Sequence, residues 1–147
     1  MRRKIWLSAL IGVAALGLCA GAGAATADLS GTWSFQGSES GASIIIVQHG
    51  DQFRVNIDNS DARGRPMKFV ADGSEQQLQG PGGAARLMTA VWEGSELVIS
   101  TRTVLNSKVR RKAEIRVTPS GADILNLVVT RGSGADRQTR NLVLERR

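Results

Sequence analysis

Residues 43–58 have the sequence SIIIVQHGDQFRVNID, and this stretch decides the fold class. Its first part, residues 43–48, is rich in β-branched side chains, and its second part, residues 53–58, alternates strictly between apolar and polar side chains. β-branched residues favour strands, and apolar side chains at every second position are typical of a strand with one buried face. His49 and Gly50 supply a turn between the two parts, so the stretch predicts a β-hairpin.

The same pattern continues from residue 28 onward, without a convincing helix. We expect strands near residues 33–35, 43–48, 53–58, 67–71, 75–79, 86–92, 96–104, 109–117, 124–130 and 138–144. The links between these segments are short, and short links join antiparallel neighbours because a parallel pair needs a long crossover. A meander of this kind leaves two unpaired edges unless the sheet closes on itself.

Closure of the meander into a barrel removes both edges. Strands of about seven residues span roughly 23 Å, which suits the wall of a small barrel. We therefore predict an all-β fold, an antiparallel up-and-down β-barrel of about 8–10 strands. A β-sandwich of two packed sheets is the alternative.

The first 27 residues differ in kind from the rest of the chain. Three cations at residues 2–4 precede an apolar run at 5–19, which is shorter than the roughly 20 residues that a membrane-spanning helix needs. Small residues with Ala-x-Ala endings follow at 20–27, a pattern typical of a secretory signal peptide. We predict a signal peptide at residues 1–27, one domain at residues 28–147, and a periplasmic or secreted protein.

Cys19 offers an alternative location, because Leu16–Cys19 resembles a lipoprotein cleavage box and would anchor the protein through a lipidated Cys19. The chain has one Cys and one His, which cannot supply the roughly four nitrogen and sulfur ligands of a structural zinc site. If residues 1–27 are removed, no thiol or disulfide chemistry remains.

We expect no enzyme activity and no catalytic residues. His49 is the only histidine, and it lies in a predicted turn with no acid or nucleophile at a fixed spacing from it. The acidic pairs Asp58 with Asp61 and Asp72 with Glu75 flank turns, where carboxylates commonly cap the backbone. The glycine-rich residues 80–83 lack the Lys-Ser/Thr of a phosphate loop. From these features together, we expect neither a metal nor a cofactor.

Charge is distributed unevenly along a chain whose formal net charge is +6. Residues 28–99 hold five basic and nine acidic residues, whereas residues 100–147 hold eleven basic and four acidic residues. Lys108, Arg110, Lys112 and Arg116 share one face of the predicted strand at 109–117, and we expect this basic face to point outward to solvent.

Arg111 is the exception in this strand, because it falls on the apolar face near the strand's end. An inward arginine near a barrel mouth is a suitable anchor for a ligand carboxylate or phosphate. The alternative is that the stem of Arg111 packs on the core while its charged group reaches solvent from the rim.

Three short motifs in order resemble the small bacterial exported lipocalin-like domains, which are calycin-like barrels with a Gly-x-Trp opening. They are Gly31-Thr32-Trp33, the Trp-x-Gly hairpin at residues 92–99, and Leu142-Val143-Leu144. The resemblance implies a barrel for a small apolar or amphipathic ligand, with Gly31 and Trp33 packed at its closed end. It also makes Arg140 the candidate cation over Trp33. Unlike in large lipocalins, we expect no helix after the barrel, and unlike fatty-acid-binding proteins, the chain has no Tyr.

These observations predict an exported, non-enzymatic binding module for a small apolar or amphipathic ligand, with Arg111 as anchor and Phe53, Phe69 and Trp92 as walls. The alternative is a barrel filled by its own side chains, whose basic outer face binds an anionic envelope polymer or lipid head groups. We expect a monomer. We expect no nucleic-acid binding, because aromatic residues do not interleave with the cations.

Overall fold

The computed structural model describes residues 26–37, 41–59, 62–63, 66–79, 84–132 and 134–147. The predicted signal peptide, apart from its last two residues, lies outside the described residues, as do Cys19, Asp61 and the glycine-rich residues 80–83. Of the residues described, none belongs to a helix long and apolar enough to cross a membrane.

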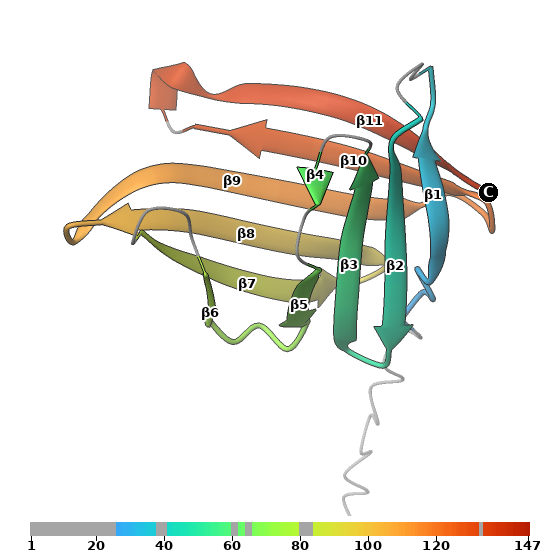
Figure 1. Ribbon diagram of the computed structural model, residues 1–147, viewed down its shortest axis with the longest axis horizontal. Coiled ribbons are helices and arrows are strands. Elements are labelled where there is room, and N and C mark those ends of the chain that lie inside the picture. The colour runs from blue at the N-terminus through green and yellow to red at the C-terminus, as the bar shows by residue number, and fades with distance from the viewer. Residues whose placement is uncertain (1–25, 38–40, 60–61, 64–65, 80–83, 133) are drawn as a thin grey trace, which may run out of the picture.

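The described chain is built almost entirely from strands, and all of them pair antiparallel (Figure 1). The strands are β1 (Gly31–Phe35), β2 (Ser43–His49), β3 (Gln52–Asn59), β4 (Ala62–Arg63), β5 (Met67–Val70), β6 (Gln76–Gln79), β7 (Ala85–Glu93), β8 (Glu96–Leu105), β9 (Lys108–Pro119), β10 (Ile124–Arg131) and β11 (Gln138–Arg146). One turn of 3-10 helix, η2 (Gly134–Asp136), lies between β10 and β11.

The strands form one sheet in the order β4-β3-β2-β1-β11-β10-β9-β8-β7-β6, with β5 pairing against β3. The first and last strands, β1 and β11, lie side by side, so the two ends of the domain close the sheet. A gap remains between β5 and β7, and it is spanned by an isolated bridge between Asp72 and Val91. The result is a nearly closed barrel, which confirms the predicted antiparallel up-and-down β-barrel.

Side chains also help to close the gap between β5 and β7. The backbone N–H of Val70 donates to Gln76 Oε1 at 2.8 Å, and Gln76 Nε2 donates back to the Val70 carbonyl at 2.6 Å. A primary amide can do this because its oxygen accepts and its nitrogen donates, as a backbone partner would. Next to it, the N–H of Gly73 donates to the Ala90 carbonyl at 2.8 Å.

The barrel has a covered end and an open end. Figure 1 shows β1–β3 lying across the direction of β7–β11, with the β8–β9 and β10–β11 turns reaching well past β3 on the left. The inner face is the side of the strands that bears the buried core. This core consists of Leu29, Trp33, Phe53, Phe69, Ala71, Met88, Ala90, Leu97, Ile99, Val117, Leu125, Leu127 and Leu144.

The β8–β9 hairpin corrects one detail of the predicted outer basic face. The register shifts between Thr103 and Val104, so that β9 holds one extra residue, Arg110, opposite β8. Such a bulge reverses the side on which the following residues project. Lys108 therefore lies opposite Leu105, on the side of the sheet that bears Arg111, and does not share the outer face with Lys112.

Candidate functional site

The covered end is sealed by Trp33, whose side chain is 1% exposed. Its indole Nε1 donates to the Leu29 carbonyl at 3.0 Å, and the Arg146 guanidinium lies 4.5 Å from the ring centroid. A cation at this distance over an indole is attracted by the ring's negative face. The cation over Trp33 is thus Arg146 and not Arg140, because the β1–β11 register pairs Trp33 with Arg146.

Gly31 makes room for this contact. A Cβ at Gly31 would lie 2.7 Å from the Arg146 guanidinium, and its φ of 149° is one that other residues rarely adopt. The guanidinium also donates to the carbonyls of Ser30 at 2.7 Å and Ala122 at 2.9 Å. Gly31, Trp33 and Arg146 form a structural seal at the covered end.

The structure brings together the three predicted ligand walls in one aromatic cluster. The Phe53 and Phe69 rings stack with centroids 5.1 Å apart, and the Trp92 ring lies 6.3 Å from that of Phe53. The Trp92 indole Nε1 is buried and makes no hydrogen bond with any described residue. Buried donors in proteins almost always have a partner, so this unpaired N–H is unusual among the described residues.

The inner face of β7–β11 changes from apolar to cationic toward the open end. Residues that lie side by side on neighbouring strands form rows across the sheet. The row at Trp92 continues through Leu97, Val117, Leu127 and Leu142. The next row is Ala90, Ile99, Ile115, Val129 and Arg140. The third is Met88, Thr101, Ala113, Arg131 and Gln138, and the fourth is Arg86, Thr103 and Arg111.

Four arginines of these rows, Arg86, Arg111, Arg131 and Arg140, form what we call the inner arginine group. All four are exposed, and none forms an ion pair with an acidic side chain within the described residues. Arg111 was predicted from the sequence as a ligand anchor, whereas Arg86 and Arg131 were not. The alternation of side chains along β7 and β10 could have identified these two arginines. Arg86 is two residues from Met88 and Arg131 is two residues from Val129, so each arginine points to the same face of the sheet as its apolar neighbour.

The structure does not bring Arg111 to the aromatic cluster. Arg111 is six residues from Val117 along β9, which at about 3.3 Å per residue is about 20 Å from the row of Trp92. Arg140 lies in the row next to that of Trp92, but on β11, four strands across the sheet from β7. The aromatic cluster and the inner arginine group therefore mark two ends of one inner face.

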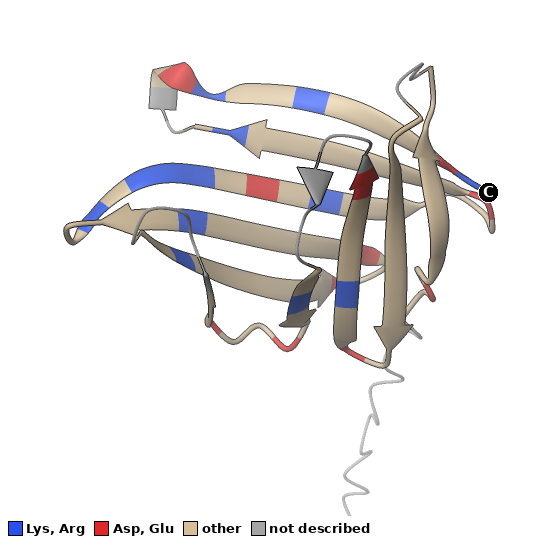
Figure 2. Cartoon of the chain, viewed as in Figure 1, with Lys and Arg blue, Asp and Glu red and all other residues tan. Residues whose placement is uncertain are grey.

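On the outer face toward the covered end, one arginine is surrounded by three carboxylates. Arg116 contacts the carboxylates of Glu114 and Glu96 at 2.8 Å each and of Glu93 at 3.2 Å. The hydrogen bonds that Arg116 donates to Glu114 and then to Glu96 hold the pKa of Arg116 above its ordinary value. Figure 2 shows the resulting asymmetry, with blue Lys and Arg segments along the open ends of β8 and β9.

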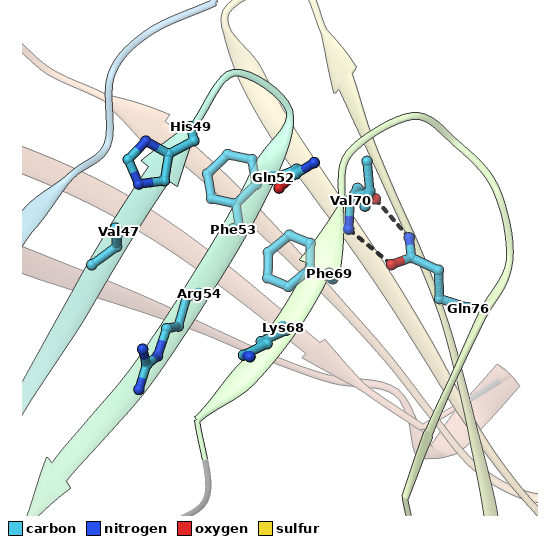
Figure 3. Close-up of a pocket in the computed structure, with 9 residues that line it drawn as sticks. All are labelled: Val47, His49, Gln52, Phe53, Arg54, Lys68, Phe69, Val70 and Gln76. Atoms are coloured by element: carbon cyan, nitrogen blue, oxygen red, sulfur yellow. Dashed lines mark hydrogen bonds between the residues drawn. The ribbon is translucent and has the colours of Figure 1, made fainter.

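A hollow of about 460 Å³ lies at the β2–β3 turn (Figure 3). Its lining consists of Val47, His49, Gln52, Phe53, Arg54, Lys68, Phe69, Val70 and Gln76. Val47, Arg54 and Lys68 lie side by side across β2, β3 and β5, on the opposite parity to the buried Phe53 and Phe69. These three side chains therefore point away from the barrel interior.

Figure 3 shows His49 near the turn, and the nine residues that line the hollow include no carboxylate. Arg54 and Lys68 are directly opposed like charges, which disfavours the pair. In the part of the chain that the structure describes, no three His, Cys, Asp or Glu side chains gather as a metal site.

A nearly closed antiparallel barrel with these features fits the lipocalin-like, or calycin, class of folds. No family model and no curated protein matches the sequence. Solved structures do match. A fatty acid transporter, REP1-NXSQ, has a TM-score of 0.60 and 12% identity over 82% of this chain and 96% of that chain.

Two secretory abundant heat soluble proteins from Ramazzottius varieornatus are also similar. Protein 4 of that group has a TM-score of 0.55 and 16% identity over 72% of this chain and 69% of its own. The other has a TM-score of 0.59 and 14% identity over 81% of this chain and 95% of its own. At such identities the likeness establishes a shared fold.

Proposed function

We propose that this protein is a non-enzymatic binding module for a small amphipathic anion, such as a long-chain fatty acid. The observation that carries the proposal is the inner face of β7–β11, which is apolar beside Trp92 and bears Arg140, Arg131 and Arg111 in successive rows toward the open end. An amphipathic anion matches this arrangement, because it has an apolar chain at one end and a negative charge at the other.

The chemistry of the two ends supports this orientation. At the covered end, Trp92 is only partly buried and offers apolar surface beside the packed rings of Phe53 and Phe69; contact of such surface with an acyl chain is favourable at about 25 cal/mol per Å². At the open end, arginine side chains without acidic partners can donate charge-assisted hydrogen bonds to a carboxylate or phosphate. A span of about 20 Å between the two ends accommodates an extended acyl chain.

The similar fold of a protein named as a fatty acid transporter agrees with this proposal. The pattern of residues 1–27 supports export, and we propose a bacterial protein that works in the periplasm or outside the cell. Export through a signal peptide at residues 1–27 predicts that the native protein begins near Ala25 or Asp28, whereas lipidation would leave Cys19 as the first residue.

The test is a fluorescence titration with a long-chain fatty acid and with the neutral alcohol of equal chain length. Arg111→Met, Arg131→Met and Arg140→Met each remove a charge but keep an apolar stem. A charge-assisted hydrogen bond contributes about 1.5–3 kcal/mol, so each variant should bind the acid about tenfold or more weakly and the alcohol unchanged. Trp92→Phe should abolish most of the fluorescence response.

Arg54→Met is the matched control, because Arg54 projects from the outside of the barrel and its loss should leave both affinities unchanged. The proposal is wrong if neither ligand changes the fluorescence or raises the melting temperature. Equal weakening of acid and alcohol by the three inner variants would show that the arginines do not contact the head group.

A further inference from the structure

We propose that the tip of the β8–β9 hairpin, residues 105–112, docks on membranes that contain anionic phospholipids. The tip combines exposed apolar and cationic side chains. Leu105 is 37% exposed and Val109 is 45% exposed, on a hairpin that also bears Lys108, Arg110, Arg111 and Lys112, all exposed. No ion pair joins these four cations to a described acidic side chain.

The tip is a defined structure and not a loose loop. Asn106 and Ser107 both have positive φ, of 51° and 60°, as a two-residue hairpin turn of the tightest kind requires. Below the tip, β9 continues its pairing with β10, and the N–H of Gly132 donates to the Lys112 carbonyl at 3.0 Å. Because little conformational freedom is lost on contact, such a projection is well suited to bind a surface.

The positions of the apolar residues favour a bilayer over a soluble polyanion. The register places Leu105 and Val109 on opposite sides of the hairpin, because Val109 pairs with Val104 and Leu105 pairs with Lys108. Apolar side chains on both sides of one projecting tip can be buried together only by inserting the tip. A hydrated polyanion would contact the cations and leave both apolar side chains in water.

The charge around the tip agrees with an anionic surface. Figure 2 shows the blue band of β9 at the end of the molecule, with further blue segments on the neighbouring strands. Arg131 lies on the neighbouring strand β10 and Arg140 on the next strand, β11, while Glu114 of β9 is engaged by Arg116. Cations near a bilayer surface contribute roughly 1 kcal/mol each, equivalent to about a fivefold increase in binding.

The experiment measures co-sedimentation of the protein with phosphatidylcholine vesicles, with and without phosphatidylglycerol. We expect stronger binding to the vesicles that contain phosphatidylglycerol than to phosphatidylcholine alone, and weaker binding at high salt. Arg110→Gln combined with Lys112→Gln should lower the partition coefficient roughly 25-fold, about fivefold per cation. Arg54→Gln combined with Lys68→Gln removes the same charge from another part of the molecule and should have little effect.

A second set of variants tests insertion. Heparin serves as the soluble polyanion for comparison. Val109→Ser and Leu105→Ser should each weaken vesicle binding severalfold and leave heparin binding unchanged. In the Val109→Trp variant, the fluorescence emission of the introduced indole should shift to shorter wavelength when anionic vesicles are added. Loss of heparin and vesicle binding to the same extent in the charge variants, with no effect of Val109→Ser, would overturn membrane docking in favour of a soluble polyanion. Every variant retains residues 1–27, so differences between variants report the hairpin.

Membrane docking and ligand binding share Arg111, but they can be tested separately. Arg110 and Lys112 are outside the inner arginine group, so their double variant should bind fatty acid normally. Vesicle binding without fatty-acid binding would support docking and refute the proposed ligand. Fatty-acid binding with equal vesicle binding in the wild type and in the Arg110 and Lys112 double variant would refute docking alone.

Discussion

At the scale of single residues, the packing at the covered end of the barrel depends on Gly31, whose missing side chain leaves room for Arg146. Arg146 can reach over Trp33 and bond to the Ser30 carbonyl because nothing projects from Gly31. The cation–π contact, the hydrogen bonds and the buried indole are thus parts of one arrangement. Removing any one of them should disturb the others.

Gly31→Ala should destabilise the protein. A Cβ there would contact Arg146 at 2.7 Å, and a strained backbone conformation costs about 1–3 kcal/mol in addition to that contact. Gly94→Ala is the control, because Gly94 also has a positive φ, of 66°, but has nothing within 4 Å of an added Cβ. Urea unfolding should show a larger loss for Gly31→Ala than for Gly94→Ala.

The same change made in an Arg146→Ala background should cost less than it does alone, because the obstructed guanidinium is gone. Additive losses in that cycle would show that the contact with Arg146 does not explain the need for glycine.

At the scale of elements, the weakest part of the wall is the gap between β5 and β7. Asp72 begins the crossing, and its carboxylate accepts hydrogen bonds from the Ser74 hydroxyl at 2.6 Å and the Ser74 N–H at 2.8 Å. These bonds, the hydroxyl first, lower the pKa of Asp72 below its ordinary value. Gln76 completes the crossing by bonding both backbone groups of Val70.

Gln76→Glu should loosen this gap at neutral pH. The introduced carboxylate cannot donate to the Val70 carbonyl, and an unsatisfied, partly buried group costs about 1–3 kcal/mol. Repulsion from that carbonyl raises the folded-state pKa of the introduced carboxyl. The lost stability should therefore be recovered as the pH falls below that value and the carboxyl becomes a donor again.

Hydrogen exchange at the Val70 amide checks this prediction, together with urea unfolding across the acid range. Gln77→Glu, at the exposed neighbouring position of β6, serves as the control and should change neither measurement. Unaltered exchange at Val70 in Gln76→Glu would show that the side-chain amide does not hold the gap.

At the scale of the whole molecule, the barrel is closed by its two chain ends. β7–β11 form a meander of neighbouring hairpins, whereas β1 pairs with β11 across most of the sequence. Contacts between distant segments bear a larger entropic cost of loop closure and tend to form late in folding. The seal at Trp33 therefore belongs to the last part of the barrel to assemble.

Trp33→Ala should lower the free energy of unfolding by about 3–5 kcal/mol, as truncation of a buried aromatic side chain usually does. Because its contacts form late, the change should appear mainly as faster unfolding. Leu125→Ala, inside the meander, should instead slow folding. Stopped-flow circular dichroism distinguishes these cases, and a Trp33→Ala variant that folds slowly but unfolds normally would contradict the assignment.

Features of this protein that depend on residues close together in the sequence were predictable, and features that depend on pairing between distant strands were not. Alternation and turn residues are local, so the hairpin at residues 43–58 and the antiparallel meander follow from the sequence alone. Alternation also placed Arg111 on the inner face and identified Phe53, Phe69 and Trp92 as inward aromatics. The bulge at Arg110 was not predictable, because one extra residue on β9 is defined only by its pairing with β8.

The sequence by itself thus determined the all-β class, the strand succession and the inward side of most strands, because each depends on neighbours within a few residues. Tertiary structure alone decided that Arg146 rather than Arg140 lies over Trp33, since the two differ only in their register against β1. It also decided that Arg111 lies about 20 Å from the aromatic cluster, because parity tells which side a residue faces but not how far along the barrel it lies.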